Sequence, residues 1–171
     1  QIKKGEIEQG DIMVVIGGGP SGTGMEETYQ LTSALKHISW GKTVSLITDA
    51  RFSGVSTGAC FGHVAPEALA GGPIGKLRDN DIIEIIVDRN KLTGSVNFIG
   101  TTDRPLTPEE GAYELAMRSV HPELRAHAFL PDDTRLWAAL QSVSGGTWRG
   151  CIYDTDKIID VINAGKKALG L

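Results

Sequence analysis

The chain has 171 residues, 22 of them glycine and 7 proline, and a net charge of -4 from 17 basic and 21 acidic side chains. The length suits one domain, and a hydrophobic share of 40% is too high for a disordered chain. The glycines follow no Gly-X-Y period, which excludes collagen, and the acidic balance argues against a nucleic-acid partner, which normally meets a basic patch.

Membrane and disulfide-rich classes are also disfavoured. The longest apolar run, Ile12 to Ile16, is far shorter than the roughly 20 residues of a spanning helix. The chain begins with Gln-Ile-Lys-Lys, without an initiator Met or an apolar signal segment, which suggests processing or a piece of a longer protein. Cys60 and Cys151 are too few for a disulfide scaffold or a four-thiolate metal site, and we expect a reduced, cytoplasmic setting.

The first half of the chain alternates apolar runs with glycine-rich loops. Residues 12–16 and 43–48 are apolar and β-branched, which predicts two buried strands. A glycine loop at 17–24 separates the first strand from a helix predicted over 25–38 by the spacing of its apolar residues. A second loop, 49–62, precedes a short helix predicted over 64–69.

The second half starts with strands and ends with helices. Residues 81–88 and 91–98 predict a β-hairpin. Thr107-Pro-Glu-Glu is a helix-start signature, with proline in the first turn and acidic residues at the positive end of the helix dipole, and the helix should continue to Val120. Further helices are predicted over 132–140 and 154–169, separated by a third glycine loop at 144–150. These elements predict a β-rich α/β domain whose chemistry lies on loops.

The first glycine loop lies between a strand and a helix, where backbone N–H groups often bind phosphate. The loop lacks the Gly-Lys-Ser/Thr ending of a P-loop, and Pro20 and Ser21 interrupt the Gly-x-Gly-x-x-Gly pattern. A tight structural loop is therefore favoured over a nucleotide site. Glu26 and Glu27 follow it, either as compensation for the helix dipole or as carboxylate ligands of Mg²⁺, and residue chemistry alone favours the first.

The second loop holds the densest polar cluster in the chain. Ser53 lacks a nucleophile elbow, since Arg51 stands where that motif requires glycine, and a serine that caps a turn is the commoner outcome. His63 has nothing in the sequence to pair it with Ser53, so a structural hydrogen-bonding role is favoured for it. Cys60 is expected to be a small buried hydrophobe.

Five strings, in order along the chain, resemble one enzyme family. They are Gly22-Thr-Gly-Met-Glu-Glu27, Leu31-Thr-Ser-Ala34, Leu46-Ile-Thr-Asp-Ala-Arg-Phe-Ser-Gly54, Gly62-His-Val-Ala-Pro-Glu-Ala68 and Gly71-Gly-Pro-Ile74. The family is that of the iron-sulfur dehydratases, which includes dihydroxy-acid, phosphogluconate and aldonic-acid dehydratases. The residues after 120, including Gly145-Gly-Thr-Trp-Arg-Gly-Cys-Ile-Tyr153, resemble the pentonate branch, which includes D-xylonate dehydratases.

This resemblance implies that residues 1–171 form the C-terminal domain of a longer dehydratase, a swivelling, β-barrel-like domain with a mixed sheet and flanking helices. The cluster-binding N-terminal domain would be absent from the chain and would supply the iron-sulfur cluster ligands and most Mg²⁺ ligands. The implied partners are a small-molecule sugar acid, the protein's own N-terminal domain and further copies in a homo-oligomer.

The resemblance also assigns roles to individual residues. Glu27 takes the position of the family's Mg²⁺ carboxylate, although Glu26 replaces the usual proline beside it and is the competing candidate. Ser53 takes the position of the serine base. Some relatives carry a threonine two residues further on, where this chain has Val55, so the substrate contact expected there moves to Ser56 or Thr57. Neither Cys60 nor Cys151 matches a cluster ligand.

The implied reaction is the dehydration of an aldonate, such as D-xylonate, to a 2-keto-3-deoxy acid. Ser53 would remove the C2 proton, and nearby cations and glycine-loop donors would stabilise its alkoxide. Three alternatives stay open: a branched-chain dihydroxy-acid dehydratase domain, a non-catalytic module whose glycine loops bind a phosphorylated ligand, and a structural domain that only covers a partner domain.

Overall fold

The computed structural model describes residues 2–171. Its nine strands are short: β1 (Ile12–Val15), β2 (Glu27–Thr28), β3 (Ser45–Thr48), β4 (Arg51–Phe52), β5 (Ala59–Phe61), β6 (Ile83–Asp88), β7 (Thr93–Phe98), β8 (Gly100–Thr101) and β9 (Arg104–Pro105). Its five α-helices are α1 (Pro20–Thr23), α2 (Gln30–Leu35), α3 (Pro108–Met117), α4 (Asp132–Ser144) and α5 (Thr155–Leu169). The chain is therefore a mixed α/β fold, as the sequence predicts.

The centre of the fold is a three-stranded parallel sheet in the order β1-β3-β5. Ile12 pairs with Ser45, and Ser45 pairs in turn with Ala59. The predicted strands at 12–16 and 43–48 are thus confirmed with slightly shorter bounds. Leu46 and Ile47 point to opposite faces of β3 and anchor separate apolar clusters, which explains why this strand is apolar at successive positions.

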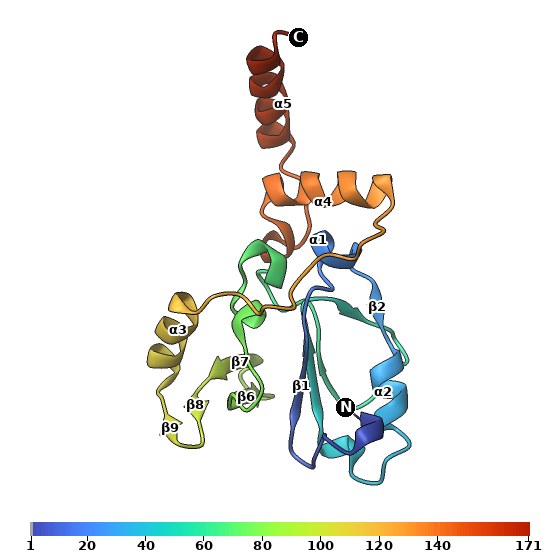
Figure 1. Ribbon diagram of the computed structural model, residues 1–171, viewed down its shortest axis with the longest axis vertical. Coiled ribbons are helices and arrows are strands. Elements are labelled where there is room, and N and C mark those ends of the chain that lie inside the picture. The colour runs from blue at the N-terminus through green and yellow to red at the C-terminus, as the bar shows by residue number, and fades with distance from the viewer. Residues whose placement is uncertain (1) are drawn as a thin grey trace.

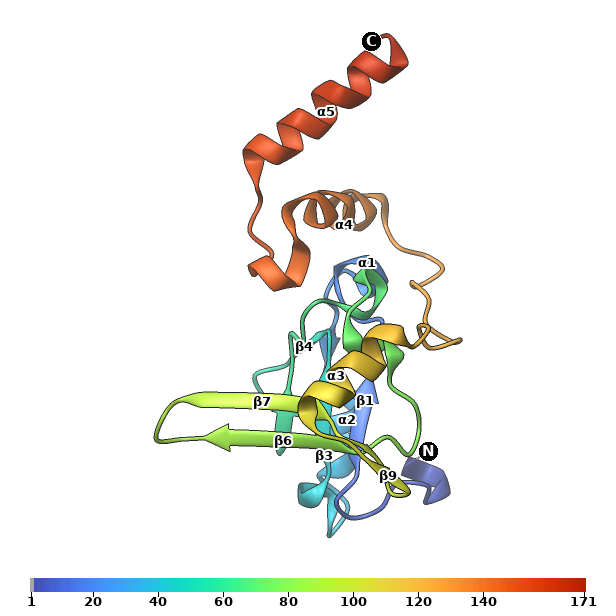
Figure 2. The same cartoon turned by 90° about the vertical axis from the view of Figure 1, so that its left-hand side faces the viewer.

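The remaining strands form three two-stranded sheets, β2-β4, β6-β7 and β8-β9. Within residues 2–171, no strand pairing closes the four sheets into a barrel. The expected mixed sheet with flanking helices is present as several short sheets, but the barrel-like shape is not closed. The predicted hairpin is confirmed as the antiparallel pair β6-β7, which projects to one side of the core (Figure 2).

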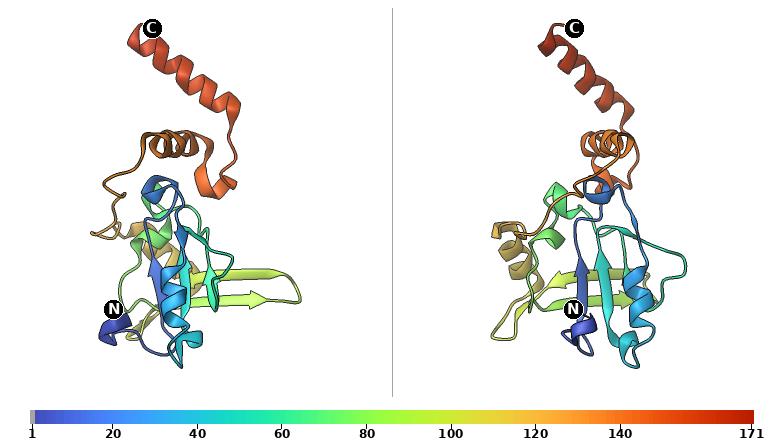
Figure 3. Two further views of the ribbon diagram at one scale, coloured as in Figure 1. Left: turned by 90° about the vertical axis from the view of Figure 1, so that its right-hand side faces the viewer. Right: turned by 45° about the vertical axis from the view of Figure 1, so that its right-hand side comes forward.

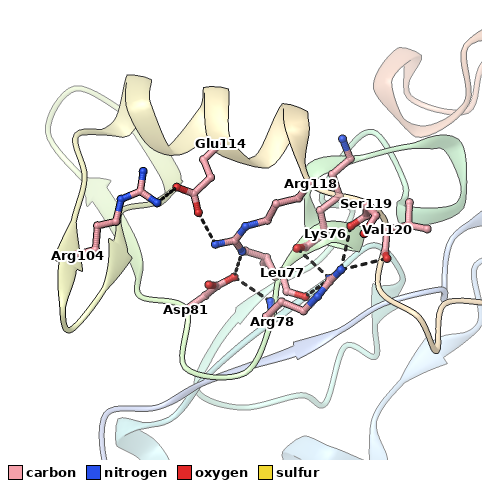
Figure 4. A network of polar contacts seen from close by, with 9 residues as sticks. All are labelled: Lys76, Leu77, Arg78, Asp81, Arg104, Glu114, Arg118, Ser119 and Val120. Carbon is pink, nitrogen blue, oxygen red and sulfur yellow. Dashed lines mark hydrogen bonds and ion pairs between the residues drawn. The ribbon is translucent and has the colours of Figure 1, made fainter.

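Helix α3 packs on β7 of this hairpin, and a charged network joins the helix to Asp81 before β6 and to Arg104 on β9 (Figure 4). The predicted start is confirmed by a capping box between Thr107 and Glu110. At the other end of the helix, the Arg118 guanidinium binds Asp81 at 2.6 Å and Glu114 at 2.7 Å, and it lies 4.4 Å from the centroid of the Phe98 ring. The network holds α3, the hairpin and the loop before β6 together.

Residues 127–171 form a helical tail above the sheet (Figure 1). The predicted helices at 132–140 and 154–169 are confirmed as α4, which ends later than expected at Ser144, and α5. Helix α4 packs on α1, and the N–H of His127 donates to the carbonyl of Gly22 at 2.8 Å. Helix α5 extends away from the body and has no buried residue. Within residues 2–171, no helix is both long enough and apolar enough to cross a membrane.

Two predicted helices are wrong. In place of one helix over 25–38, the chain forms β2 and the shorter α2, while α1 lies before this range in the first glycine loop. The left-handed Gly24 ends α1, and the segment after it pairs with β4, so tertiary pairing overrides the helical apolar spacing. In place of a helix over 64–69, only a 3-10 turn forms, at Ala68–Ala70. Pro66 disfavours helical geometry in the residue before it. The N–H of Ala68 donates to the Asp49 carboxylate, so it is not available to a helix.

Candidate functional site

The three parallel strands present their carboxyl ends at one edge of the sheet. Gly17 to Gly19 follow β1, Asp49 follows β3, and Gly62 and His63 follow β5. All three strands run toward α1 (Figure 3). Ligands of open α/β sheets bind outside the carboxyl ends of the strands, so this edge is the candidate site.

Asp49 connects the loops at this edge of the sheet and is fully buried, with 0% of its surface exposed. Its Oδ1 accepts a hydrogen bond from the N–H of Gly18 at 2.9 Å, and its Oδ2 accepts from Gly17 at 3.2 Å and Ala68 at 2.9 Å. These three donors replace the hydrogen bonds that the buried carboxylate would make to water, and they tie two loops to the end of β3. Glycine is required at 18, since a Cβ there would lie 2.6 Å from that of Ala50.

Glu67 is a second buried carboxylate at this edge. It accepts hydrogen bonds from the backbone N–H of Ser21 at 3.0 Å and from the Ser21 hydroxyl at 2.8 Å. Burial raises the pKa of Glu67, and the nearby Asp49 charge raises it further, while the bonds from Ser21 oppose the shift. A Cβ on Gly19 would lie 2.3 Å from the carboxylate, so the first glycine loop is closely fitted over this side chain.

The pair β2-β4 carries Glu27 on β2 and ends directly before Ser53. Glu27 is the register partner of Arg51, and Ser53 is two residues beyond Arg51. The Nε of Arg51 donates to the carbonyl of Met25 at 2.8 Å, and its Nη1 lies 3.9 Å from Oε1 of Glu27. Ser53 directly follows the last residue of β4 and lies one position beyond the pairing with β2. Glu27 and Ser53, the two residues that the sequence singles out, thus belong to β2 and to the segment just after β4.

The Ser53 hydroxyl lies in an exposed turn. Its Oγ accepts a long hydrogen bond of 3.4 Å from the N–H of Val55, and its carbonyl accepts from the N–H of Ser56 at 3.0 Å. Ser53 thus caps the following turn, while its hydroxyl hydrogen stays uncommitted. The Ser56 hydroxyl donates to the carbonyl of Thr28 at 3.4 Å, which links this turn back to β2. Thr57 is exposed beside it.

The edge offers a cation few ligands from this chain. Within residues 2–171, no three His, Cys, Asp or Glu side chains gather into a group that would hold a metal ion. Glu26 and Glu27 are both exposed, and Glu27 stands on the strand beside Ser53. One carboxylate fits Mg²⁺, which takes one or two protein carboxylates and keeps waters. The described residues thus offer this position single carboxylates and not a complete ligand set.

Neither cysteine fits a cluster. Cys60 lies on β5, where its Sγ is 3.5 Å from the carbonyl of Thr57, and Cys151 lies in the helical tail. Burial raises the pKa of both thiols, and within residues 2–171 no group of three His, Cys, Asp or Glu side chains forms around either. Cys60 is half-buried, less enclosed than expected.

Sequence reasoning missed Asp49 and Glu67 as organisers of the edge. A signal was present for Asp49, because an acidic residue directly after a buried strand must find several donors. Glu67 does not directly follow a buried strand, and its partner Ser21 is distant in the sequence, so no local pattern indicates its role.

The chain is similar to known dehydratases. Residues 1–126 match the C-terminal family of dihydroxy-acid/6-phosphogluconate dehydratases. Two relatives from Escherichia coli (strain K12) cover nearly the whole chain: "D-xylonate dehydratase YagF" is 89% identical over 99% of it, and "D-xylonate dehydratase YjhG" is 67% identical over 92%. A "Dihydroxy-acid dehydratase" from Caldicellulosiruptor saccharolyticus is 50% identical over 54% of the chain and spans 17% of that relative. The chain spans about a quarter of the length of the two Escherichia coli relatives, 26% and 24%.

Proposed function

The chain belongs to the dihydroxy-acid/6-phosphogluconate dehydratase family, and from this membership we propose that it is the C-terminal domain of a hydro-lyase that dehydrates an aldonate, D-xylonate first among the candidates. The relatives that cover nearly all of the chain carry that activity in their names. The observation that supports the proposal is the pairing of β2, which carries Glu27, with β4, which ends directly before Ser53.

In this proposal Ser53 is the base that removes the proton from C2 of the substrate. Its hydroxyl hydrogen is uncommitted among the described residues, and its side chain is half-buried in the turn after β4. A serine hydroxyl is a weak base at neutral pH, so positive charge must lie near it, and Arg51 stands two residues before Ser53, on the short strand β4. Loss of the C2 proton and of the C3 hydroxyl as water leaves an enol, which becomes the 2-keto-3-deoxy acid.

Glu27 is proposed as the one carboxylate that this domain gives to Mg²⁺. The ion, when bound, supplies Lewis-acid polarisation of the substrate oxygens. Glu27 stands beside Arg51 at 3.9 Å, so its charge is already partly balanced before any ion binds. Ser56, held against β2 through the carbonyl of Thr28, is the proposed hydroxyl contact to the substrate. The iron-sulfur cluster finds no fitting thiols in this chain, and its ligands are proposed to lie in the protein's own N-terminal domain.

The proposal is tested by assaying the full-length protein and the 171-residue chain separately with D-xylonate and Mg²⁺. We expect the full-length protein to release the 2-keto-3-deoxy acid and the domain alone to release none, because the domain holds only part of a site. Steady turnover by the isolated domain would contradict the proposal. Assembly of the full-length protein into a homo-oligomer is a further expectation, tested by light scattering of the same sample.

The second candidate is a branched-chain dihydroxy-acid dehydratase, favoured by the 50% identity to the Caldicellulosiruptor saccharolyticus relative over about half of the chain. A substrate panel separates the two. Higher kcat/KM for pentonates than for branched 2,3-dihydroxy acids supports the first candidate, and the reverse order supports the second.

A further inference from the structure

One imidazole at the carboxyl edge has no partner. The His63 side chain is exposed and makes no hydrogen bond or ion pair with any described residue. His121 and His127 differ, since each Nδ1 accepts a backbone N–H two residues on, and His37 lies beyond the end of α2, away from the carboxyl ends of the strands. The structural hydrogen-bonding role that the sequence favours for His63 is therefore absent from its side chain.

The backbone holds His63 in an uncommon conformation. Its φ is +56°, in the left-handed region that residues other than glycine rarely occupy. The His63 N–H donates to the carbonyl of Ala50 at 2.8 Å, and the N–H of Val64 donates to the carbonyl of Thr48 at 3.0 Å. These two bonds fix the segment that carries His63 along the end of β3. Left-handed residues that the surrounding structure holds in place are concentrated at functional sites.

The same segment lies against the residue that precedes the proposed base. A Cβ on Gly62 would lie 3.1 Å from the ring of Phe52 and 3.2 Å from the carbonyl of Ala50, so only a small residue lets the segment approach. Phe52 is followed directly by Ser53. The imidazole of His63 and the hydroxyl of Ser53 thus come from two segments packed on each other at one edge of the sheet.

We propose that His63 is the acid that delivers a proton to C3 of the enol formed at this edge. The inference rests on the proposed dehydratase function. After Ser53 has taken the C2 proton and the C3 hydroxyl has left as water, the enol carries a C2–C3 double bond. Collapse of the enol O–H bond forms the C2 carbonyl, and the double-bond electrons take the imidazolium proton to form a new C3–H bond. The proton released from O2 restores the imidazolium through water.

Imidazole suits this step because it exchanges protons readily at neutral pH. A proton delivered by a fixed side chain reaches one face of the double bond, whereas a proton taken from bulk water reaches either face. The chemistry therefore predicts that His63 controls which face of C3 receives the proton, as well as the rate, and a deuteron delivered in D₂O makes that face visible as a configuration at C3.

The test uses the full-length protein in D₂O with D-xylonate, and nuclear magnetic resonance of the product reads the configuration at C3. The wild type is expected to place deuterium at C3 in one configuration. His63→Asn, chosen because asparagine tolerates the left-handed backbone, should lower turnover about 10²-fold and give both configurations. His37→Asn is the matched control and should retain one configuration.

The possible results separate the role of His63 from the proposed dehydratase function. A single configuration from His63→Asn, or a mixture from the wild type, overturns the role of His63 while leaving the dehydratase proposal intact. A wild type that does not dehydrate any 2,3-dihydroxy acid overturns the proposed function itself. Where His63→Asn is too slow for product analysis, imidazole added to the buffer is expected to restore turnover, and a failure of that rescue in the folded variant overturns the inference.

Discussion

Glu27 and Arg51 are register partners across the parallel pair β2-β4, and Oε1 of Glu27 lies 3.9 Å from Nη1 of Arg51. This relationship places the proposed metal carboxylate next to the strand that ends at the proposed base. Both side chains are about half exposed, at 44% and 51%, so the pair contributes little to stability and leaves Glu27 available to a cation.

Replacing Glu27 by Gln should weaken Mg²⁺ binding to the full-length protein by at least about tenfold, because the amide carries no charge for the ion. Isothermal titration calorimetry with Mg²⁺ measures this. Glu26→Gln is the matched control, since Glu26 is the neighbouring exposed carboxylate and should leave the affinity within about twofold of the wild type. The opposite ranking would reassign the ligand to Glu26.

Asp49→Asn should destabilise the fold by about 2 kcal/mol, because the amide group faces one of the three backbone N–H donors and leaves it without an acceptor. Asp49→Ala should cost more, since all three donors then lose their acceptor. Urea denaturation followed by tryptophan fluorescence measures both. Asp160→Asn on the exposed face of α5 is the control, and a stability loss for it equal to that of Asp49→Asn would refute the role of the buried carboxylate.

Arg118→Met should destabilise the fold by about 3 kcal/mol, because the Asp81 side chain is only 4% exposed and loses its charged partner. The control is Arg135→Met, which removes an exposed pair with Asp132 and should cost less than about 1 kcal/mol. Equal midpoints of urea denaturation for the two variants would show that the network in Figure 4 contributes no more than a surface ion pair.

The stability of the wild type relative to Glu67→Gln should fall as pH rises. Burial raises the pKa of folded Glu67 above its ordinary value of 4.5, so the folded state holds this proton more tightly than the unfolded state does. The loss begins near 4.5 and is complete above the raised pKa of the folded state. Denaturation of both proteins at about pH 4 and about pH 7 measures the difference. A wild type that gains on the variant with rising pH would mean that the hydrogen bonds from Ser21 outweigh burial.

The regular elements could be predicted because their signals are local. The apolar, β-branched runs of β1, β3 and β6 and the capping box of α3 are visible in the sequence and recur in the structure. The helix expected over 25–38 fails because two-residue strands such as β2 have no local signature and form only when a distant partner is present. The helix expected over 64–69 could have been excluded from the sequence, because Pro66 disfavours helical geometry in the residue before it.

The sequence names candidate site residues but not their geometry. The resemblance to the family singles out Glu27 and Ser53, yet only the fold shows that β2, which carries Glu27, pairs with β4, which ends directly before Ser53. Asp49 organises the edge through bonds to Gly18 and Ala68, which are far apart in the sequence, so no periodic pattern reveals it. The unpaired side chain of His63 likewise emerges only from the fold.

The central claim is that Ser53 is the base of a dehydratase, and the kcat of Ser53→Ala in the full-length protein tests it most directly, with Ser56→Ala as the matched hydroxyl deletion in the same turn. We expect Ser53→Ala to lower kcat about 10³-fold while cluster absorbance and Mg²⁺ affinity stay unchanged, because a positioned base contributes roughly 10² to 10⁴ to the rate. Ser56→Ala should act mainly on KM. A Ser53→Ala enzyme that turns over at nearly the wild-type rate would remove Ser53 from the mechanism.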